Sequence, residues 1–456
     1  MATRGKLGFW QLFATSIGVV VSQVTIVALL QGVGIGGWGF MAALAVASCL
    51  AFANAMAYAE MALMMPSAGS LSSYAEAAIG NFPAILLVFA GYVTPALFGL
   101  PAELILANQM VANVLPGALP PFVVPVLLVV VFVGLNILGT DVFARVQTVL
   151  SMTVLVFLLV TGLVALAGHA AAPQAAAAQS FSGPGHDPVF LGVVALAFWV
   201  LVGSEFVTPL VEEARNPNRD LPRAMLLGLL TITAAWFVYA LGTIGTVPRN
   251  QLGASAAPHL QYALAVYGPS ARWWFAVLAV IASASLLNTV LAAVPRMLWG
   301  MANNGQVFPI LKRTHPRLGT PVMAILFVGA LPLIGLVWSR GDPNSILPLT
   351  IAASVAWLLA YMTAQLSLIV LRRRRPELPR PFRVPGFPWV PLLAIAGMGY
   401  VVANSAPTPE LVPQIARYTG VVLAVFALVG ALWVKYVMKK GLFEPGAPVI
   451  HAQKSA

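Results

Sequence analysis

Long apolar segments separated by short polar connections run through almost the whole chain. A helix needs about 20 mostly apolar residues to cross a bilayer, and twelve segments of the sequence meet or approach that length. The connections are short and rich in Gly, Pro and Asn, which end helices. The pattern predicts an all-α polytopic membrane protein with twelve transmembrane helices. The expected spans are residues 10–31, 39–64, 83–113, 120–139, 146–168, 189–211, 224–247, 272–302, 321–338, 346–371, 387–405 and 418–438.

Two of these spans carry polar interruptions at similar depth. The first reads SIGVVVSQVTIVALLQG, with Ser22-Gln23 near its middle, and the sixth reads AFWVLVGSEFVTPLV, with Gly203-Ser204-Glu205. The two lie five spans apart, and an odd number of spans gives successive blocks opposite topology. Interrupted helices at matching positions of two halves are a sequence sign of a transporter site. The expected organisation is a cytoplasmic segment 1–9, inverted repeats 10–168 and 189–371, two extra helices in 387–438, and a cytoplasmic tail 439–456.

Composition and charge agree with a membrane protein and indicate its orientation. The chain is 60% hydrophobic and 8% charged, against about 25% charged in soluble domains. Its net charge of +11 does not indicate a nucleic-acid partner, because the basic residues gather in alternate connections. With the N-terminus inside, all but four of the 24 Lys and Arg residues lie on the inner side. This asymmetry predicts cytoplasmic termini and a multi-pass protein of the cell's inner membrane. The residues expected outside are Arg249, Arg272, Arg340 and Arg417.

Glu205 is the first candidate for a functional residue. An acidic residue inside a membrane helix costs about 2.5–3.5 kcal/mol on insertion scales, so it marks a functional site by default. Gly203 allows the helix to open, which a membrane tolerates where the backbone faces protein or a water-filled cavity. A proton and a substrate ammonium group would compete for this carboxylate, which predicts proton coupling at Glu205. The alternative is a structural carboxylate bonded to other helices.

Other residues near the interruptions extend this hypothesis. Trp199, six residues before Glu205, could close over a ligand through cation–π contact, and Phe198 is a similar candidate. Glu103, a second acid, would suit a cationic substrate in a cavity, with a structural role as the alternative.

The sequence contains no motif for metal binding, nucleotide binding or nucleophilic catalysis. The five His residues fall in connections or in the tail, and no pair has a metal-ligand spacing. We find no nucleophile elbow, no nucleotide motif and no phosphate loop of the GxxxxGK[ST] type. The sequence therefore predicts neither a metal nor a cofactor, and no enzyme activity.

Four stretches, in order, resemble the amino acid–polyamine–organocation (APC) superfamily, whose members have the LeuT-type fold. The exit of the sixth span is the most specific of them. The stretches are AYAEMALMMPSAGSLSSYAEAAIG (57–80), the turn NILGTDVFARVQ (136–147), the sixth span with its exit (203–224), and SLLNTVLAAVPRMLWGMANNG (285–305).

The resemblance implies secondary active transport of an amino acid, an organic amine or a polyamine by alternating access. It implies a substrate cavity between the broken first and sixth helices, flanked by the third, eighth and tenth. Half-helix N-termini would bind a substrate carboxylate, and opened carbonyl groups would bind its amine. The expected substrate-binding residues are Val21, Ser22, Gln23, Val24, Glu103, Phe198, Trp199, Val202, Gly203, Ser204 and Glu205.

Two departures from the family pattern bear on substrate and coupling. Ser22-Gln23-Val24 stands where relatives usually carry Gly-x-Gly, which raises the expectation of an amine without a carboxylate. The fifth span lacks the Lys that some relatives place where others hold sodium, and Ser283 and Ser285 are the candidate sodium ligands. Proton symport is the preferred hypothesis. Amino acid/amine antiport, sodium symport, and a non-transporting channel or sensor are the alternatives, and a homodimer is expected by analogy only.

Overall fold

Helices form all of the regular structure in the part of the chain that is described. The computed structural model describes residues 7–120, 122–172, 188–342, 346–405 and 412–447. Within these ranges an isolated β-bridge joins Leu7 to Ala214. The predicted cytoplasmic N-terminus (1–9) and tail (439–456) lie partly outside the described residues.

The helices follow one another in a simple order, with two of the spans divided. Up to residue 166 they are α1 (Phe9–Gly18), α2 (Gln23–Gly36), α3 (Trp38–Met64), α4 (Leu71–Ile79), α5 (Asn81–Val88), the π-helix η1 (Phe89–Val93), α6 (Thr94–Val114), α7 (Val123–Leu138) and α8 (Thr140–Leu166). From residue 188 they are α9 (Pro188–Trp199), the 3-10 helix η2 (Ser204–Glu213), α10 (Pro217–Ile244), α11 (Arg249–Ala254), α12 (Pro258–Tyr267), α13 (Ala271–Asn303), the 3-10 helix η3 (Pro309–Lys312), α14 (Val322–Trp338) and α15 (Ile346–Arg374). The last are α16 (Trp389–Ala403), α17 (Val412–Leu432) and the π-helix η6 (Trp433–Met438).

The molecule is a multi-pass membrane protein by helix length and composition. In the described ranges, eight helices are long and apolar enough to span a bilayer, or nine if the bent pair α1–α2 is one span. This is fewer than the twelve that the hydrophobic pattern predicts. The difference lies in the apolar helices α7, α14 and α16, which have 16, 17 and 15 residues. At 1.5 Å per residue they reach about 25 Å, short of a hydrocarbon core of about 30 Å.

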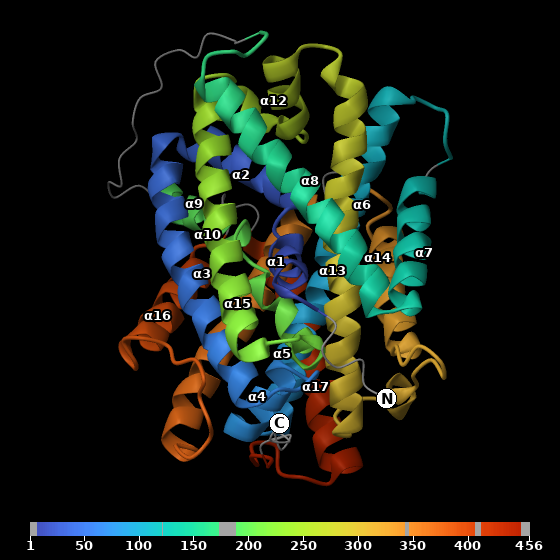
Figure 1. Ribbon diagram of the computed structural model, residues 1–456, viewed down its shortest axis with the longest axis vertical. Helices are drawn as coiled ribbons and strands as arrows, with labels where there is room; N and C mark the ends of the chain where they lie inside the picture. The colour runs from blue at the N-terminus through green and yellow to red at the C-terminus, as the bar shows by residue number, and fades with distance from the viewer. Residues whose placement is uncertain (1–6, 121, 173–187, 343–345, 406–411, 448–456) are drawn as a thin grey trace.

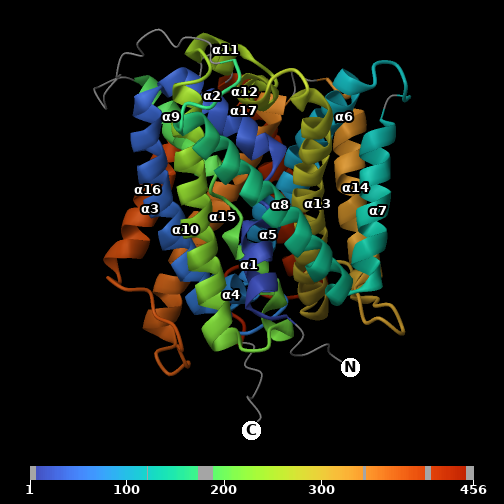
Figure 2. The same cartoon turned by 45° about the horizontal axis from the view of Figure 1, so that its top comes forward.

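The helices pack into one bundle with α1 at its centre (Figure 1). α1 packs against α8, α10 and η2. The short helices α11 and α12 lie at one end of the bundle and α4 at the opposite end (Figures 1 and 2). With 9, 6 and 10 residues, α4, α11 and α12 are too short to span a bilayer, and the hydrophobic pattern does not predict them.

The first span is broken where the polar pair Ser22-Gln23 predicts a break. α1 ends at Gly18, α2 begins at Gln23, and their axes are bent by 57°. Ser22 has an extended backbone, and its Oγ accepts a hydrogen bond from the Thr25 N–H. Serine is a preferred N-cap because its side chain satisfies a backbone donor of the first turn. The sequence therefore starts a second helix here rather than continuing the first.

The sixth span is broken at Gly203, also as predicted. α9 ends at Trp199 and η2 begins at Ser204. Gly203 has a φ of +127°, a conformation that glycine adopts far more readily than other residues. η2 then carries the chain to α10, which begins at Pro217 instead of the expected residue 224. Proline at the first helical position and Asp220 in the first turn favour this earlier start.

A buried ion-pair cluster ties α3 to the end of α15 and the segment after it. The Glu60 carboxylate is fully buried. Arg372 Nε donates to Glu60 Oε1 at 2.7 Å, and the Val384 N–H donates to Glu60 Oε2 at 2.6 Å. Arg380 Nε lies 3.4 Å from Glu60 Oε1. Burial lowers the pKa of Arg380, although Glu60 opposes this effect.

Candidate functional site

The two helix breaks touch each other. A Cβ atom on Gly203 would lie 2.6 Å from Val19 Cβ and 2.7 Å from Val19 Cγ1, far inside van der Waals contact. Glycine at 203 therefore serves two purposes, since it supplies the positive φ and allows the break of the sixth span to close on that of the first. The sequence places both breaks at similar depth, and the fold brings them into contact.

A small cavity lies where the two breaks meet. It has a volume of about 30 Å³, and by this measure a single water molecule needs about 10–15 Å³. A ligand the size of an amino acid would require the lining side chains to move apart, so the site is nearly closed. The lining residues are Val19, Ser22, Val24, Thr25, Tyr92, Pro95, Ala96, Gly99, Leu100, Trp199, Val202, Phe206, Leu286, Val290 and Trp357.

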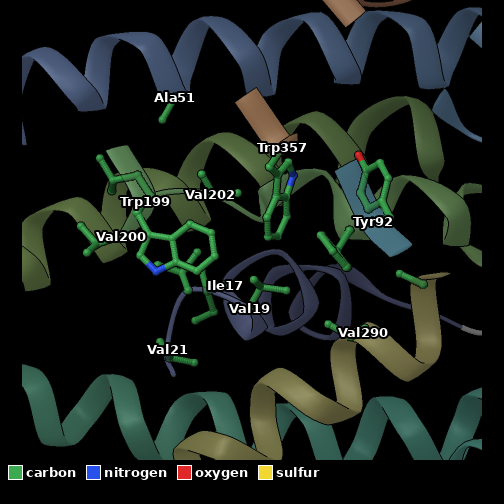
Figure 3. Close-up of a cluster of buried hydrophobic side chains, with 14 of the residues drawn as sticks. Ile17, Val19, Val21, Ala51, Tyr92, Trp199, Val200, Val202, Val290 and Trp357 are labelled. Atoms are coloured by element: carbon green, nitrogen blue, oxygen red, sulfur yellow. The ribbon is translucent and has the colours of Figure 1, made fainter. Parts of the chain in front are cut away.

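Aromatic rings from four elements form much of the cavity wall. Figure 3 shows Tyr92, Trp199 and Trp357 around Val19. The ring centroids of Trp199 and Trp357 are 5.9 Å apart, and those of Phe206 and Trp357 are 5.4 Å apart. Aromatic faces attract cations within about 6 Å of the ring centroid. The wall therefore suits an organic cation or an apolar group.

Glu205 is hydrogen-bonded to Trp357, which lines the cavity, but Glu205 itself does not line it. Its side chain is fully buried in the first turn of η2. Trp357 Nε1 donates to Glu205 Oε1 at 3.2 Å, while Glu205 Oε2 has no hydrogen-bond partner among the described residues. The hydroxyl groups of Tyr58, Tyr92 and Tyr361 interact electrostatically with this carboxylate. The Tyr361 hydroxyl group and the Gly203 N–H also lie near this carboxylate. A buried acid beside a cavity, with an oxygen that has no close hydrogen bond, can bind a proton.

Glu103 lies at the N-terminus of α2. Its Oε1 accepts from the Gln23 N–H and its Oε2 from the Val24 N–H, each at 2.9 Å. Ser283 Oγ donates to Glu103 Oε1 at 2.7 Å. The sequence leaves a cavity acid and a structural acid open at this position, and the structure places Glu103 as a cap on the second half of the broken first span.

A hydrogen-bonded chain continues from Glu103 to the end of the bundle that carries α12. Ser283 Oγ accepts from Gln23 Nε2 at 2.7 Å, and Gln23 Oε1 lies 3.1 Å from His259 Nε2. Since the Gln23 amide nitrogen is turned toward Ser283, His259 Nε2 is the donor to Gln23 Oε1. His259 is fully buried on α12, and burial lowers its pKa from 6.5 to about 3.

We predict that His259 makes stability depend on pH. As the pH falls below 6.5 the unfolded chain binds a proton at His259, whereas the folded chain does so only near pH 3. Between pH 6.5 and about pH 3 the free energy of unfolding therefore falls by about 1.4 kcal/mol for each unit by which the pH drops.

His259→Gln keeps a donor for Gln23 but does not titrate. The apparent unfolding temperature of this variant should fall less between pH 6.5 and 5 than that of the wild type. His169→Gln, a change at an exposed histidine, should keep the wild-type slope, and equal slopes in all three proteins would contradict the prediction.

A second polar network links α1 to α7, α8 and α13. Ser285 Oγ donates to the Gly18 carbonyl at 2.9 Å and accepts from Gln147 Nε2 at 2.9 Å. The network continues from Gln147 Oε1 to Asn288 Nδ2 at 2.8 Å, and from Asn288 Oδ1 to Asn136 Nδ2 at 2.9 Å. The hydroxyl groups of Ser283 and Ser285, the candidate sodium ligands, thus both donate and accept within the protein.

The cavity gathers only part of the predicted site. Ser22, Val24, Trp199 and Val202 line it. Six of the other predicted residues are buried beside it without lining it; they are Val21, Gln23, Glu103, Phe198, Ser204 and Glu205. Gly203 contributes through its contact with Val19. Phe198 packs instead on Tyr361, with ring centroids 6.2 Å apart.

Tyr92, Phe206 and Trp357 line the cavity, and the sequence analysis does not single them out. Phe206 follows Glu205 directly, but nothing distinguishes its ring from the many aromatic residues that only pack. Tyr92 and Trp357 lie in the third and tenth spans, which the family resemblance places beside the cavity. The resemblance is therefore the signal that could have pointed to Tyr92 and Trp357, but it indicates which helices flank the cavity and not which of their residues line it.

Comparison with known proteins agrees with this architecture. A family model described as "Amino acid permease" matches residues 7–434. The chain belongs to the amino acid permease family. This confirms the resemblance to the APC superfamily, whose matched members are transporters rather than enzymes.

Three relatives illustrate the range of proteins similar to this permease. Branched-chain amino acid permease BcaP of Bacillus subtilis (strain 168) is 26% identical over 429 residues, covering 88% of each chain. Serine/threonine exchanger SteT of the same organism is 29% identical over 219 residues, which is 47% of each chain. A probable polyamine transporter of Arabidopsis thaliana is 24% identical over 188 residues, 41% of this chain and 37% of its own.

Proposed function

We propose that this permease is a secondary active transporter that moves an amino acid or organic amine across the cell's inner membrane by alternating access. The observation that carries the proposal is the contact between the two helix breaks at Val19 and Gly203, beside one aromatic-lined cavity. Broken helices expose half-helix ends that can bind charged groups at the centre of a membrane protein. The relatives named for branched-chain amino acids and for polyamines support both substrate types.

The proposed architecture has twelve spans. α7, α14 and α16 would supply the three that are short by length alone, since a bilayer thins locally around a short helix at modest cost. Residues 10–168 and 189–371 would form the two inverted repeats, with the termini in the cytoplasm. α16 and α17 would lie outside the repeats. α17 is little buried in its own chain, which leaves a surface for lipid or for the homodimer expected by analogy.

We further propose proton symport, with Glu205 as the residue that carries the proton. Trp357 lines the cavity and donates to Glu205 Oε1, while the free Glu205 Oε2 lies among tyrosine side chains. The proton and the substrate would therefore occupy separate places, so that both can be bound at once. Separate places favour symport over an exchange in which the two compete for one position.

Sodium symport is less well supported by the same geometry. A sodium ion needs several oxygen ligands. Ser283 and Ser285 already donate to Glu103 and to the Gly18 carbonyl, and each accepts from a glutamine amide. A sodium ion there would have to displace these bonds. Antiport is the second candidate because one relative is named as an exchanger.

Transport by the purified chain in proteoliposomes tests the proposal. The labelled probe is the compound that most stabilises the protein in a thermal-shift screen of amino acids and primary amines. An inside-alkaline pH gradient should drive accumulation of this probe in sodium-free medium. A sodium gradient without a pH gradient should not, because the serine hydroxyl groups are occupied. Accumulation driven only by sodium would overturn proton coupling, and uptake only into vesicles preloaded with unlabelled probe would show antiport. Failure to move any member of the panel would contradict transport itself.

A further inference from the structure

The first turn of α2 has no backbone donor left for a ligand. The N–H groups of Gln23 and Val24 both donate to Glu103, and the N–H of Thr25 donates to Ser22 Oγ at 3.4 Å. The next N–H, of Ile26, donates to the Ser22 carbonyl at 3.1 Å. The first N–H groups of a helix lack partners within the helix and together attract an anion. Here the chain itself supplies that anion.

Glu103 is built firmly into this position. Its side chain comes from α6, is 1% exposed, and takes a third hydrogen bond from Ser283 on α13. The three groups that hydrogen-bond to Glu103 are all donors, as an ionised carboxylate, which only accepts hydrogen bonds, requires. If a ligand carboxylate displaced Glu103, the Glu103 carboxylate would lose these donors and become an unpaired buried charge, which is costly.

The other half-helix N-terminus at the cavity also holds an acid of the chain. Glu205 lies in the first turn of η2, fully buried, with Oε2 unpartnered among the described residues. The cavity lining, all of it from the described part of the chain, includes no Lys, Arg or His. A ligand carboxylate in this cavity would therefore meet the Glu103 carboxylate at the N-terminus of α2 and no basic side chain in the lining. Like charges in a desolvated site repel strongly.

The same surroundings favour a ligand ammonium group. The C-terminal ends of α1 and α9 meet at the cavity, and the C-terminal end of a helix carries partial negative charge. The rings of Trp199, Trp357 and Tyr92 line the cavity, and aromatic rings can add cation–π attraction.

We propose that Glu103 acts as a built-in carboxylate that occupies the anion position at the N-terminus of α2, and that the substrate is consequently an organic amine without an α-carboxylate. This inference rests on the proposed transport function and names the substrate class of the same cavity. Glu103 is a specificity-determining residue, because it fills the place that the carboxylate of an amino acid would require.

Matched pairs of ligands test the inference on the full-length permease. The pairs are leucine with isopentylamine, ornithine with putrescine, and arginine with agmatine; in each, the two compounds differ by one α-carboxylate. Thermal-shift titration and competition for uptake in proteoliposomes would both be measured. We expect the amine of at least one pair to bind at least about 100-fold more tightly than its amino acid, because the unpaired carboxylate forfeits two or more charged hydrogen bonds.

Two substitutions at Glu103 separate its roles. Glu103→Ala vacates the position and exposes the N–H groups of Gln23 and Val24, so the amino acid of the preferred pair should gain affinity relative to its amine by at least about tenfold. Glu103→Gln keeps the size of the side chain and continues to fill the position, so it should still discriminate against the amino acid. Monodisperse elution after detergent extraction would show that each variant is folded.

The outcomes distinguish the inference from the proposed function. If the wild-type chain binds and transports amino acids as well as their amines, the inference is wrong while transport stands. If no member of any pair stabilises the protein or crosses the membrane, the proposed function fails and the inference with it. Should Glu103→Ala not fold, the wild-type pairs alone decide. A folded Glu103→Ala variant with unchanged discrimination would also overturn the role given to Glu103.

Discussion

Glu205→Gln is expected to reduce proton-driven accumulation of substrate to the level of protein-free vesicles. Glutamine has nearly the shape of glutamate, and its carbonyl oxygen can still accept from Trp357 Nε1, which lies 3.2 Å from the native carboxylate. It cannot bind or release a proton in the accessible pH range. The variant should therefore fold and bind its ligand but lose the coupling step. Uptake of labelled probe under an inside-alkaline gradient would be measured together with counterflow in preloaded vesicles.

Counterflow distinguishes lost coupling from lost structure. If Glu205 carries the proton and does little else, counterflow in Glu205→Gln should remain within a few-fold of the wild type while net accumulation disappears. Glu377→Gln makes the same chemical change at an exposed carboxylate, 61% accessible in an ion pair with Arg375, and should transport as the wild type does. Normal accumulation by Glu205→Gln would refute its proposed role in coupling.

Glu60→Gln is expected to cause the largest loss of stability of any single side-chain change considered for this permease. The native carboxylate is fully buried and contacts Arg372 at 2.7 Å, Arg380 at 3.4 Å and the Val384 N–H at 2.6 Å. Removing its charge leaves two arginines, themselves little exposed, without their anion. Breaking a buried pair from one side typically costs about 3–5 kcal/mol.

The measurement is the fraction of protein that remains monodisperse after brief heating in detergent. Arg375→Gln is the matched control, because it removes one partner of the exposed Arg375–Glu377 pair, whose charged atoms are 3.9 Å apart. Exposed ion pairs contribute about 0–1 kcal/mol to stability. The fraction of Arg375→Gln that remains monodisperse after heating should therefore equal that of the wild type. Equal heat sensitivity of the two variants would show that the Glu60 cluster does not hold the ends of α3 and α15 together.

The sequence was most informative about the course of the chain through the membrane. Long apolar runs predict spans because backbone polar groups in a bilayer must be satisfied within the helix itself. The two breaks were predicted correctly, since Ser22 is a strong N-cap and Gly203 permits a positive φ. Both signals are local, and a local signal can be found without knowledge of the fold.

The prediction of twelve spans goes beyond what helix length establishes. α7, α14 and α16 have fewer than 18 residues of regular helix, although the apolar runs that contain them are longer. Helix ends depend on caps and on neighbouring helices, so the apolar run is a poor measure of helix length.

The site itself was only partly predictable from the sequence. Glu103 and Glu205 stood out because acids are rare in apolar segments, and both are buried near the breaks. Their partners did not stand out. Trp357 lies 152 residues from Glu205, and Ser283 lies 180 residues from Glu103. A hydrogen bond between residues so far apart in sequence depends on how the helices pack.

The sequence by itself determined that this chain is a helical membrane protein, where its first and sixth spans break, and which acids lie inside the membrane, because hydropathy, capping and backbone freedom are properties of neighbouring residues. Only the tertiary structure decided that the breaks touch at Val19 and Gly203, that Glu205 reaches the cavity through Trp357, and that Glu103 caps α2 instead of lining the cavity. The physical reason is that an acid in a membrane must find donors wherever packing provides them. Here α6 brought Glu103 to the unpaired N–H groups of α2 and α15 brought Trp357 to Glu205.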